Sequence, residues 1–66
     1  MRITANSESY DLPEGSTLDS FVRDRSLALE RVVVECNGEA LTPSEARAAV
    51  LKDGDRLEIV RIVAGG

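Results

Sequence analysis

Residues 31–41, RVVVECNGEAL, carry the clearest architectural signal in the chain. Val32, Val34 and Cys36 share one face of an alternating run, which is typical of a strand with one buried side. Asn37-Gly38 follows at once, and this dipeptide is a strong hairpin signal because both turn positions favour positive φ. The pattern predicts a hairpin that joins strands over Arg31–Cys36 and Glu39–Leu41, with Cys36 pointing inward as a small core residue.

The sequence before this hairpin predicts a strand pair and a helix. Asn6-Ser7 reads as a two-residue turn between strands over Arg2–Ala5 and Glu8–Leu12. Pro13-Glu14-Gly15 then interrupts the sheet. Ser16 and Asp19 fit an N-cap with an acid three residues on, so a helix is expected over Thr17–Arg25.

The sequence after the hairpin predicts a short helix and a long final strand. Thr42-Pro43-Ser44-Glu45 combines an N-cap, Pro at the first helical position and Glu at the third, which predicts a helix over Pro43–Val50. Asp53-Gly54 is a further turn, and Asp55–Ala64 is the last strand. Hairpins give antiparallel pairs and a helical crossover implies a parallel pair. We therefore expect an α+β fold with a mixed five-stranded sheet, one main helix across one face and a short second helix.

Composition excludes several classes of function. The 66 residues suit one domain, 1–66, and a formal net charge of −4 with one Tyr and one Phe argues against a nucleic-acid binder. One Cys and no His argue against disulfides and the common metal sites, so no bound cofactor or metal is expected. The longest apolar run, Val32–Val34, is far too short for a membrane span, and a cytoplasmic location is expected.

The chemistry-bearing feature is the end of the chain. Nucleophilic catalysis needs an activated nucleophile beside a base, and the lone inward Cys without a His argues against an enzyme. Gly65-Gly66 follows the last strand almost directly. Glycine lets an extended backbone enter a narrow channel, so a flexible working tail is one interpretation. A frayed, functionless end is the other, and the dipeptide alone does not separate them.

The chain as a whole resembles a known family. The features that carry the resemblance, in order and spacing, are Asn37-Gly38-Glu39, Pro43, Leu51-Lys52-Asp53-Gly54-Asp55, Glu58-Ile59-Val60 and Gly65-Gly66. They are similar to the ThiS sulfur carriers of thiamine biosynthesis, in the ThiS and MoaD group of ubiquitin-like β-grasp proteins.

The resemblance implies a carrier that acts as a protein co-substrate. The Gly66 carboxylate would be adenylated by a ThiF-like, E1-like adenylyltransferase that supplies the ATP and Mg²⁺. A sulfur donor protein would then help convert the adenylate to a thiocarboxylate. The thiocarboxylate would pass its sulfur to a ThiG-like thiazole synthase.

The last strand also predicts a partner surface. Leu57 and Ile59 share the face expected to meet the core, so Val60, Ile62 and Ala64 should point away from it. An exposed apolar stripe tends to mark a protein contact, and these three residues are the predicted interface. The alternative is a bulge or a covering segment that buries both faces.

Other functions stay open from the sequence. The same tail could serve as a ubiquitin-like protein modifier, or carry sulfur toward molybdopterin or cysteine. A binding module of the TGS type, which contacts RNA or nucleotides, is a different class that the negative charge disfavours. A plant-type ferredoxin is excluded because its cluster needs four Cys ligands.

Overall fold

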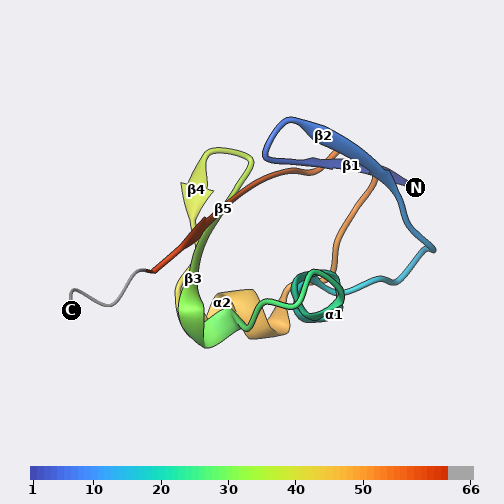
Figure 1. Ribbon diagram of the computed structural model, residues 1–66. Coiled ribbons are helices and arrows are strands. Elements are labelled where there is room, and N and C mark those ends of the chain that lie inside the picture. Colours follow the sequence, from blue (N-terminus) through green and yellow to red (C-terminus); the bar gives the residue numbers. More distant parts are fainter. Residues whose placement is uncertain (63–66) are drawn as a thin grey trace.

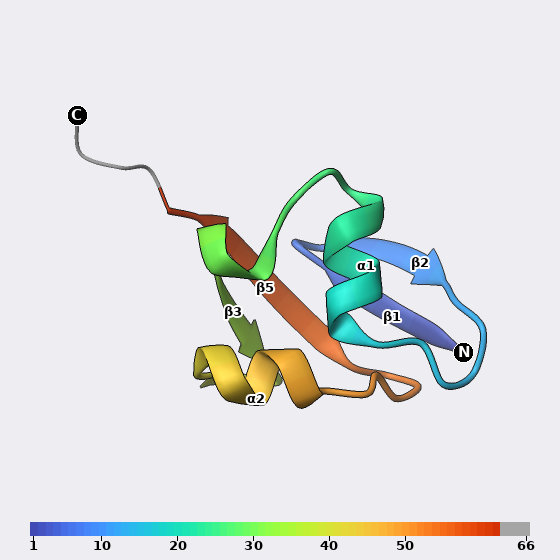
Figure 2. The same ribbon diagram turned by 90° about the horizontal axis from the view of Figure 1, so that it is seen from below.

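The computed structural model describes residues 1–62 and contains a five-stranded sheet in the order β2-β1-β5-β3-β4. Helix α1 lies across one face of this sheet and α2 covers the same side near β3, while the opposite face carries neither helix (Figures 1 and 2). The elements are β1 (Arg2–Ala5), β2 (Glu8–Asp11), α1 (Leu18–Asp24), β3 (Val32–Cys36), β4 (Glu39–Ala40), α2 (Pro43–Ala48) and β5 (Arg56–Arg61). The predicted α+β architecture is confirmed.

Both predicted hairpin turns are present. Asn6 and Ser7 have φ of 50° and 71° between β1 and β2, and Asn37 and Gly38 have φ of 52° and 86° between β3 and β4. Two successive positive φ values match the right-handed twist of the flanking strands. The strands β2 and β4 each end one residue earlier than predicted, at Asp11 and Ala40.

Strand β5 occupies the centre of the sheet and supplies the mixed pairing. It runs parallel to β1, with Ala5 opposite Leu57, and antiparallel to all of β3, with Cys36 opposite Leu57 at one end and Val32 opposite Arg61 at the other. The parallel pair expected from the helical crossover is therefore present. The strand ends at Arg61, so the predicted extension to Ala64 is wrong for Ile62, which lies outside the strand, and Val63 and Ala64 fall outside the described residues.

The Asn6 side chain extends the short parallel pairing of β1 with β5. Its backbone N–H donates to the Leu57 carbonyl at 2.9 Å. Its side-chain Oδ1 accepts from the Ile59 N–H at 2.8 Å, and its Nδ2 donates to the Ile59 carbonyl at 3.1 Å. The carboxamide thus mimics one more peptide unit of a strand, after the turn has carried the main chain away.

Helix α1 begins one residue later than predicted, because its N-cap is Thr17 and not Ser16. The Thr17 hydroxyl oxygen accepts from the Ser20 N–H at 3.1 Å. The Ser16 hydroxyl donates instead to the Pro13 carbonyl at 2.7 Å and so closes the preceding turn. Thr17 also forms a bridge with Val50, which holds it in the extended conformation that an N-cap requires.

Helix α2 begins as predicted and ends early. The Thr42 side chain accepts from the Glu45 N–H at 3.1 Å, and the Glu45 carboxylate accepts from the Thr42 N–H at 2.8 Å, which completes a capping box. The helix stops at Ala48 because the next residues pair with the segment before α1. The Ala49 carbonyl accepts from the Leu18 N–H, and the Leu51 N–H donates to the Ser16 carbonyl.

The core fills the space between the sheet and the helices. Within residues 1–62 no polar or charged side chain is fully buried, so apolar packing holds the fold. Cys36 is half-buried and packs against this core, which confirms its inward orientation. The buried residues are Ile3, Ala5, Leu18, Phe21, Val22, Leu29, Val32, Val34, Ala46, Leu51 and Leu57.

Candidate functional site

Strand β5 separates a buried face from an exposed one and leads directly to residues 63–66. Leu57 is 1% exposed, whereas Val60 is 62% exposed and Ile62 is 55% exposed. The predicted outward orientation of Val60 and Ile62 is confirmed, and the alternative in which a bulge or a neighbouring segment buries them is wrong. The predicted residues Ala64, Gly65 and Gly66 lie outside the described residues, so their roles stay predictions.

Val33 adds a third apolar side chain beside these two. It is 47% exposed and lies directly opposite Val60 in the β3–β5 register. The Ile62 N–H donates to the Arg31 carbonyl at 2.8 Å, so hydrogen bonding to the β3 side continues one residue past β5. We call Val33, Val60 and Ile62 the apolar row. It is an exposed hydrophobic surface at the end of β5 that precedes the Gly-Gly segment.

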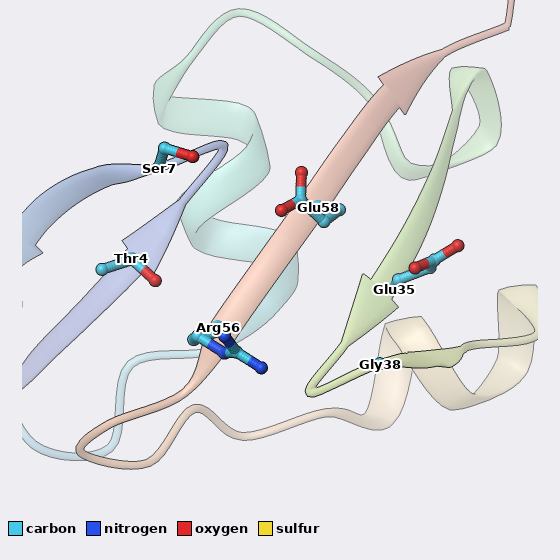
Figure 3. A pocket seen from close by; sticks show the side chains of 6 residues that line it. All are labelled: Thr4, Ser7, Glu35, Gly38, Arg56 and Glu58. Atoms are coloured by element: carbon cyan, nitrogen blue, oxygen red, sulfur yellow. The ribbon is translucent and has the colours of Figure 1, made fainter.

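A polar hollow of about 320 Å³ adjoins the apolar row on the face without helices. Figure 3 shows Thr4, Arg56, Glu58 and Glu35 projecting over this face from the neighbouring strands β1, β5 and β3. Glu35 lies directly opposite Glu58 in the register. This exposed face therefore combines an apolar strip near the last described residues with two facing carboxylates.

The Cys36 thiol is half-buried and packs against the core. Burial, and then the negative charge of Asp55, raise the pKa of this thiol above its usual value. The thiolate is the nucleophilic form of cysteine, so a raised pKa makes the side chain less reactive at neutral pH. The structure supports the interpretation of Cys36 as a packing residue.

Two features that other classes of function require are absent from residues 1–62. These residues contain no group of three or more His, Cys, Asp or Glu side chains placed to hold a metal ion. None of their helices combines the length and apolar character that crossing a membrane requires.

Comparison with protein families shows which family this chain belongs to. The model of the ThiS family matches residues 1–66, which is the whole chain and includes Gly65-Gly66. The chain belongs to the ThiS family. Solved ThiS structures agree with this assignment and with the ubiquitin-like β-grasp fold.

The similar solved structures come from Geobacter metallireducens. A crystal structure of its thiamine biosynthesis protein ThiS superposes with a TM-score of 0.80 and 30% sequence identity, and each chain is covered completely. A solution structure of a thiamine biosynthesis protein from the same organism gives a TM-score of 0.77 and 32% identity, over all of this chain and 88% of the other.

Curated relatives of this ThiS-family chain are longer proteins. The chain is 32% identical over 66 residues to a thiazole synthase of Magnetococcus marinus and 29% identical to one of Paramagnetospirillum magneticum. It spans 20% of the length of each of these relatives. Each of those thiazole synthases thus contains a segment similar to this chain.

The sequence did not point to three of the residues on this surface. Alternation with Val32, Val34 and Cys36 leaves Val33 and Glu35 on the outward face of their strand, but nothing in the sequence pairs them with Val60 and Glu58. That register joins strands some twenty residues apart and depends on the tertiary fold. Asn6 was recognised as a turn residue, and its bonds to Ile59 were missed. The sequence signal for these bonds is the presence of an Asn in the turn ahead of the helical crossover.

Proposed function

We propose that this chain is the sulfur carrier for thiazole formation in thiamine biosynthesis, with the Gly66 carboxylate as its working group. The observation that carries the proposal is the ThiS family match over residues 1–66, which extends to the closing Gly65-Gly66. The exposed apolar row immediately before this segment supports it, because a carrier must be held by its partners while its tail reacts.

The proposed chemistry begins with activation of a poor electrophile. A carboxylate resists nucleophilic attack because its anionic oxygen does not leave. In the first step a Gly66 oxygen attacks the α-phosphorus of ATP and pyrophosphate leaves, which produces an acyl adenylate. Hydrosulfide, or its equivalent from a sulfur donor protein, then attacks the acyl carbon and AMP leaves. The product is a terminal thiocarboxylate.

The chain itself acts as a co-substrate in this scheme and not as an enzyme. ATP and Mg²⁺ are assigned to the active site of a ThiF-like adenylyltransferase, and the thiocarboxylate delivers sulfur to a ThiG-like thiazole synthase. The Magnetococcus and Paramagnetospirillum thiazole synthases support the second partner, since each contains a segment similar to this chain. Val60, Ile62 and Ala64 are the proposed contact residues next to the tail.

Intact-mass measurement tests the proposed function. The chain is incubated with a ThiF-like adenylyltransferase, ATP, Mg²⁺ and a sulfide source. We expect a mass increase equal to the replacement of one oxygen by sulfur, and fragmentation should place it on Gly66. Isopeptide conjugates of Gly66 with lysines of other proteins, without any thiocarboxylate, would instead establish a modifier and refute the carrier proposal.

A charge placed in the apolar row tests the contact surface. Ile62→Asp is expected to slow adenylation of Gly66 at least tenfold, because a carboxylate would have to be desolvated when the partner covers this side chain. The rate is measured as pyrophosphate release, and circular dichroism checks the fold. The matched control is Val50→Asp, since Val50 is 56% exposed but pairs with Thr17 ahead of α1 and not with β3 or β5. Equal rates for the two variants would contradict the assignment of Ile62.

A further inference from the structure

We propose that the open sheet face binds thiazole synthase through one arginine of that enzyme, which sits on Glu35 and Glu58 with its stem along Val33 and Val60. This inference rests on the proposed function and adds the chemistry by which one partner is recognised. The facing carboxylates of Glu35 and Glu58 repel each other and so lower the stability of the isolated chain.

Glu35 and Glu58 face each other on adjacent antiparallel strands. Like charges directly opposite one another destabilise a sheet. The other end of the same face shows the favourable arrangement, because Arg2 lies opposite Asp11 and the two side chains form an ion pair at 3.1 Å. The Arg2 guanidinium accordingly holds the pKa of the Asp11 carboxyl below its usual value.

No cation within residues 1–62 forms an ion pair with either glutamate. The ion pairs in this part of the chain are Arg2 with Asp11 and Arg23 with Asp19. Arg56 projects over the same face from β5, yet it forms no ion pair with either carboxylate (Figure 3). The facing pair is therefore a surface whose charge a partner can complement.

The residues around Glu35 and Glu58 favour an arginine over a lysine as the partner side chain, because they offer apolar surface as well as charge. Val33 and Val60 form the neighbouring cross-strand pair, two residues before Glu35 on β3 and two residues after Glu58 on β5, and both are exposed on the same face. A guanidinium offers several N–H donors in a planar fork and can bond two carboxylates, which a lysine ammonium does less well. Its aliphatic stem can cover the valines. The hollow of about 320 Å³ that Glu35, Glu58 and Arg56 line together leaves room for the head group next to the two carboxylates.

We assign the arginine to thiazole synthase for two reasons. The thiazole synthases of Magnetococcus marinus and Paramagnetospirillum magneticum each contain a segment similar to this chain, so the two kinds of unit occur together in one protein. The net charge of −4 also favours a partner whose contact surface is basic.

The test pairs a binding measurement with a stability measurement on the double variant Glu35→Gln/Glu58→Gln. Binding of the chain to the thiazole synthase of the same organism is followed by titration calorimetry at low and high salt. We expect Kd to rise at least tenfold and its salt dependence to weaken, because two charge-assisted hydrogen bonds are lost. The isolated variant should melt higher by about 1–5 °C, because the repulsion between the strands is removed.

The matched control is Glu14→Gln/Asp24→Asn, which removes the same charge at exposed sites outside the sheet face. It should bind within about twofold of the unchanged chain. Equal affinity of the two double variants would overturn the inference while leaving the carrier function intact, since that function is read separately from the thiocarboxylate mass. A lower melting temperature of Glu35→Gln/Glu58→Gln would also overturn it, because the pair would then be a stabilising feature of the fold.

A third result concerns the identity of the partner. If the unchanged chain binds the adenylyltransferase or a second copy of itself through Glu35 and Glu58, and thiazole synthase independently of them, the assignment of the arginine to thiazole synthase is wrong. Arginine substitutions on the thiazole synthase surface complete the test. One of them should weaken binding of the unchanged chain and have little further effect on Glu35→Gln/Glu58→Gln.

Discussion

Removal of Gly66 is expected to abolish sulfur transfer, with a fall of at least about a thousandfold in the rate of thiocarboxylate formation. The chain would still end in a carboxylate, but that group would lie about one residue, roughly 3.5 Å, short of the position that the partner's active site requires. A misplacement of about 1 Å can cost a hundredfold in rate when reacting groups must be aligned. Thiocarboxylate is measured by intact mass after a fixed time with excess adenylyltransferase.

The controls distinguish a tail that is too short to reach the active site from a chain that no longer folds. Within the described residues 1–62, the buried core residues all lie between Ile3 and Leu57, so the melting temperature of the shortened chain should stay within about 1 °C of the original. Gly65→Ala keeps the length and adds a Cβ, and it should react slowly because a side chain hinders threading through a narrow channel. Normal thiocarboxylate formation by the shortened chain would refute Gly66 as the working residue.

Leu57→Ala should cause the largest loss of stability on β5, about 2–5 kcal/mol in the free energy of unfolding. Leu57 is 1% exposed, and it lies on the central strand between Ala5 of β1 and Cys36 of β3. Truncation there leaves a cavity that β1, β3 and the helices cannot close without giving up their own contacts. A domain of this size has a total stability of only about 3–10 kcal/mol, so the variant would be partly unfolded at 37 °C.

Urea and thermal unfolding, followed by circular dichroism, measure this effect. Val60→Ala is the matched control, because Val60 lies on the same strand and is 62% exposed. It should change the free energy of unfolding by no more than about 0.5 kcal/mol. Similar losses for Leu57→Ala and Val60→Ala would contradict the assignment of the two faces of β5.

The turns and caps were predictable because short-range chemistry determines them. Asn37-Gly38 favours positive φ at both positions and adopts it here, and Thr42 with Glu45 forms a capping box from residues three apart. Where two local solutions competed, the sequence was not sufficient. Ser16 and Thr17 are both good N-caps, and the bridge between Thr17 and Val50 selected the second.

The candidate site was also predictable only where neighbouring residues determine it. Alternation along the last strand placed Leu57 inside and Val60 outside, and both positions are as expected. Alternation says nothing about which strand lies beside β5 or in which register. The facing of Glu35 with Glu58 and of Val33 with Val60 depended on that information, and so did the bonds of Asn6 to Ile59.

The sequence by itself determined the order of the elements, the buried sides of β3 and β5, and the family resemblance that points to Gly65-Gly66 as the working end. These properties follow from neighbouring residues and from periodicity, which need no knowledge of distant contacts. The tertiary structure alone decided that β5 lies at the centre of the sheet and which side chains meet across it. Pairing of distant strands minimises the exposed apolar area of the whole chain, and no segment contains that information.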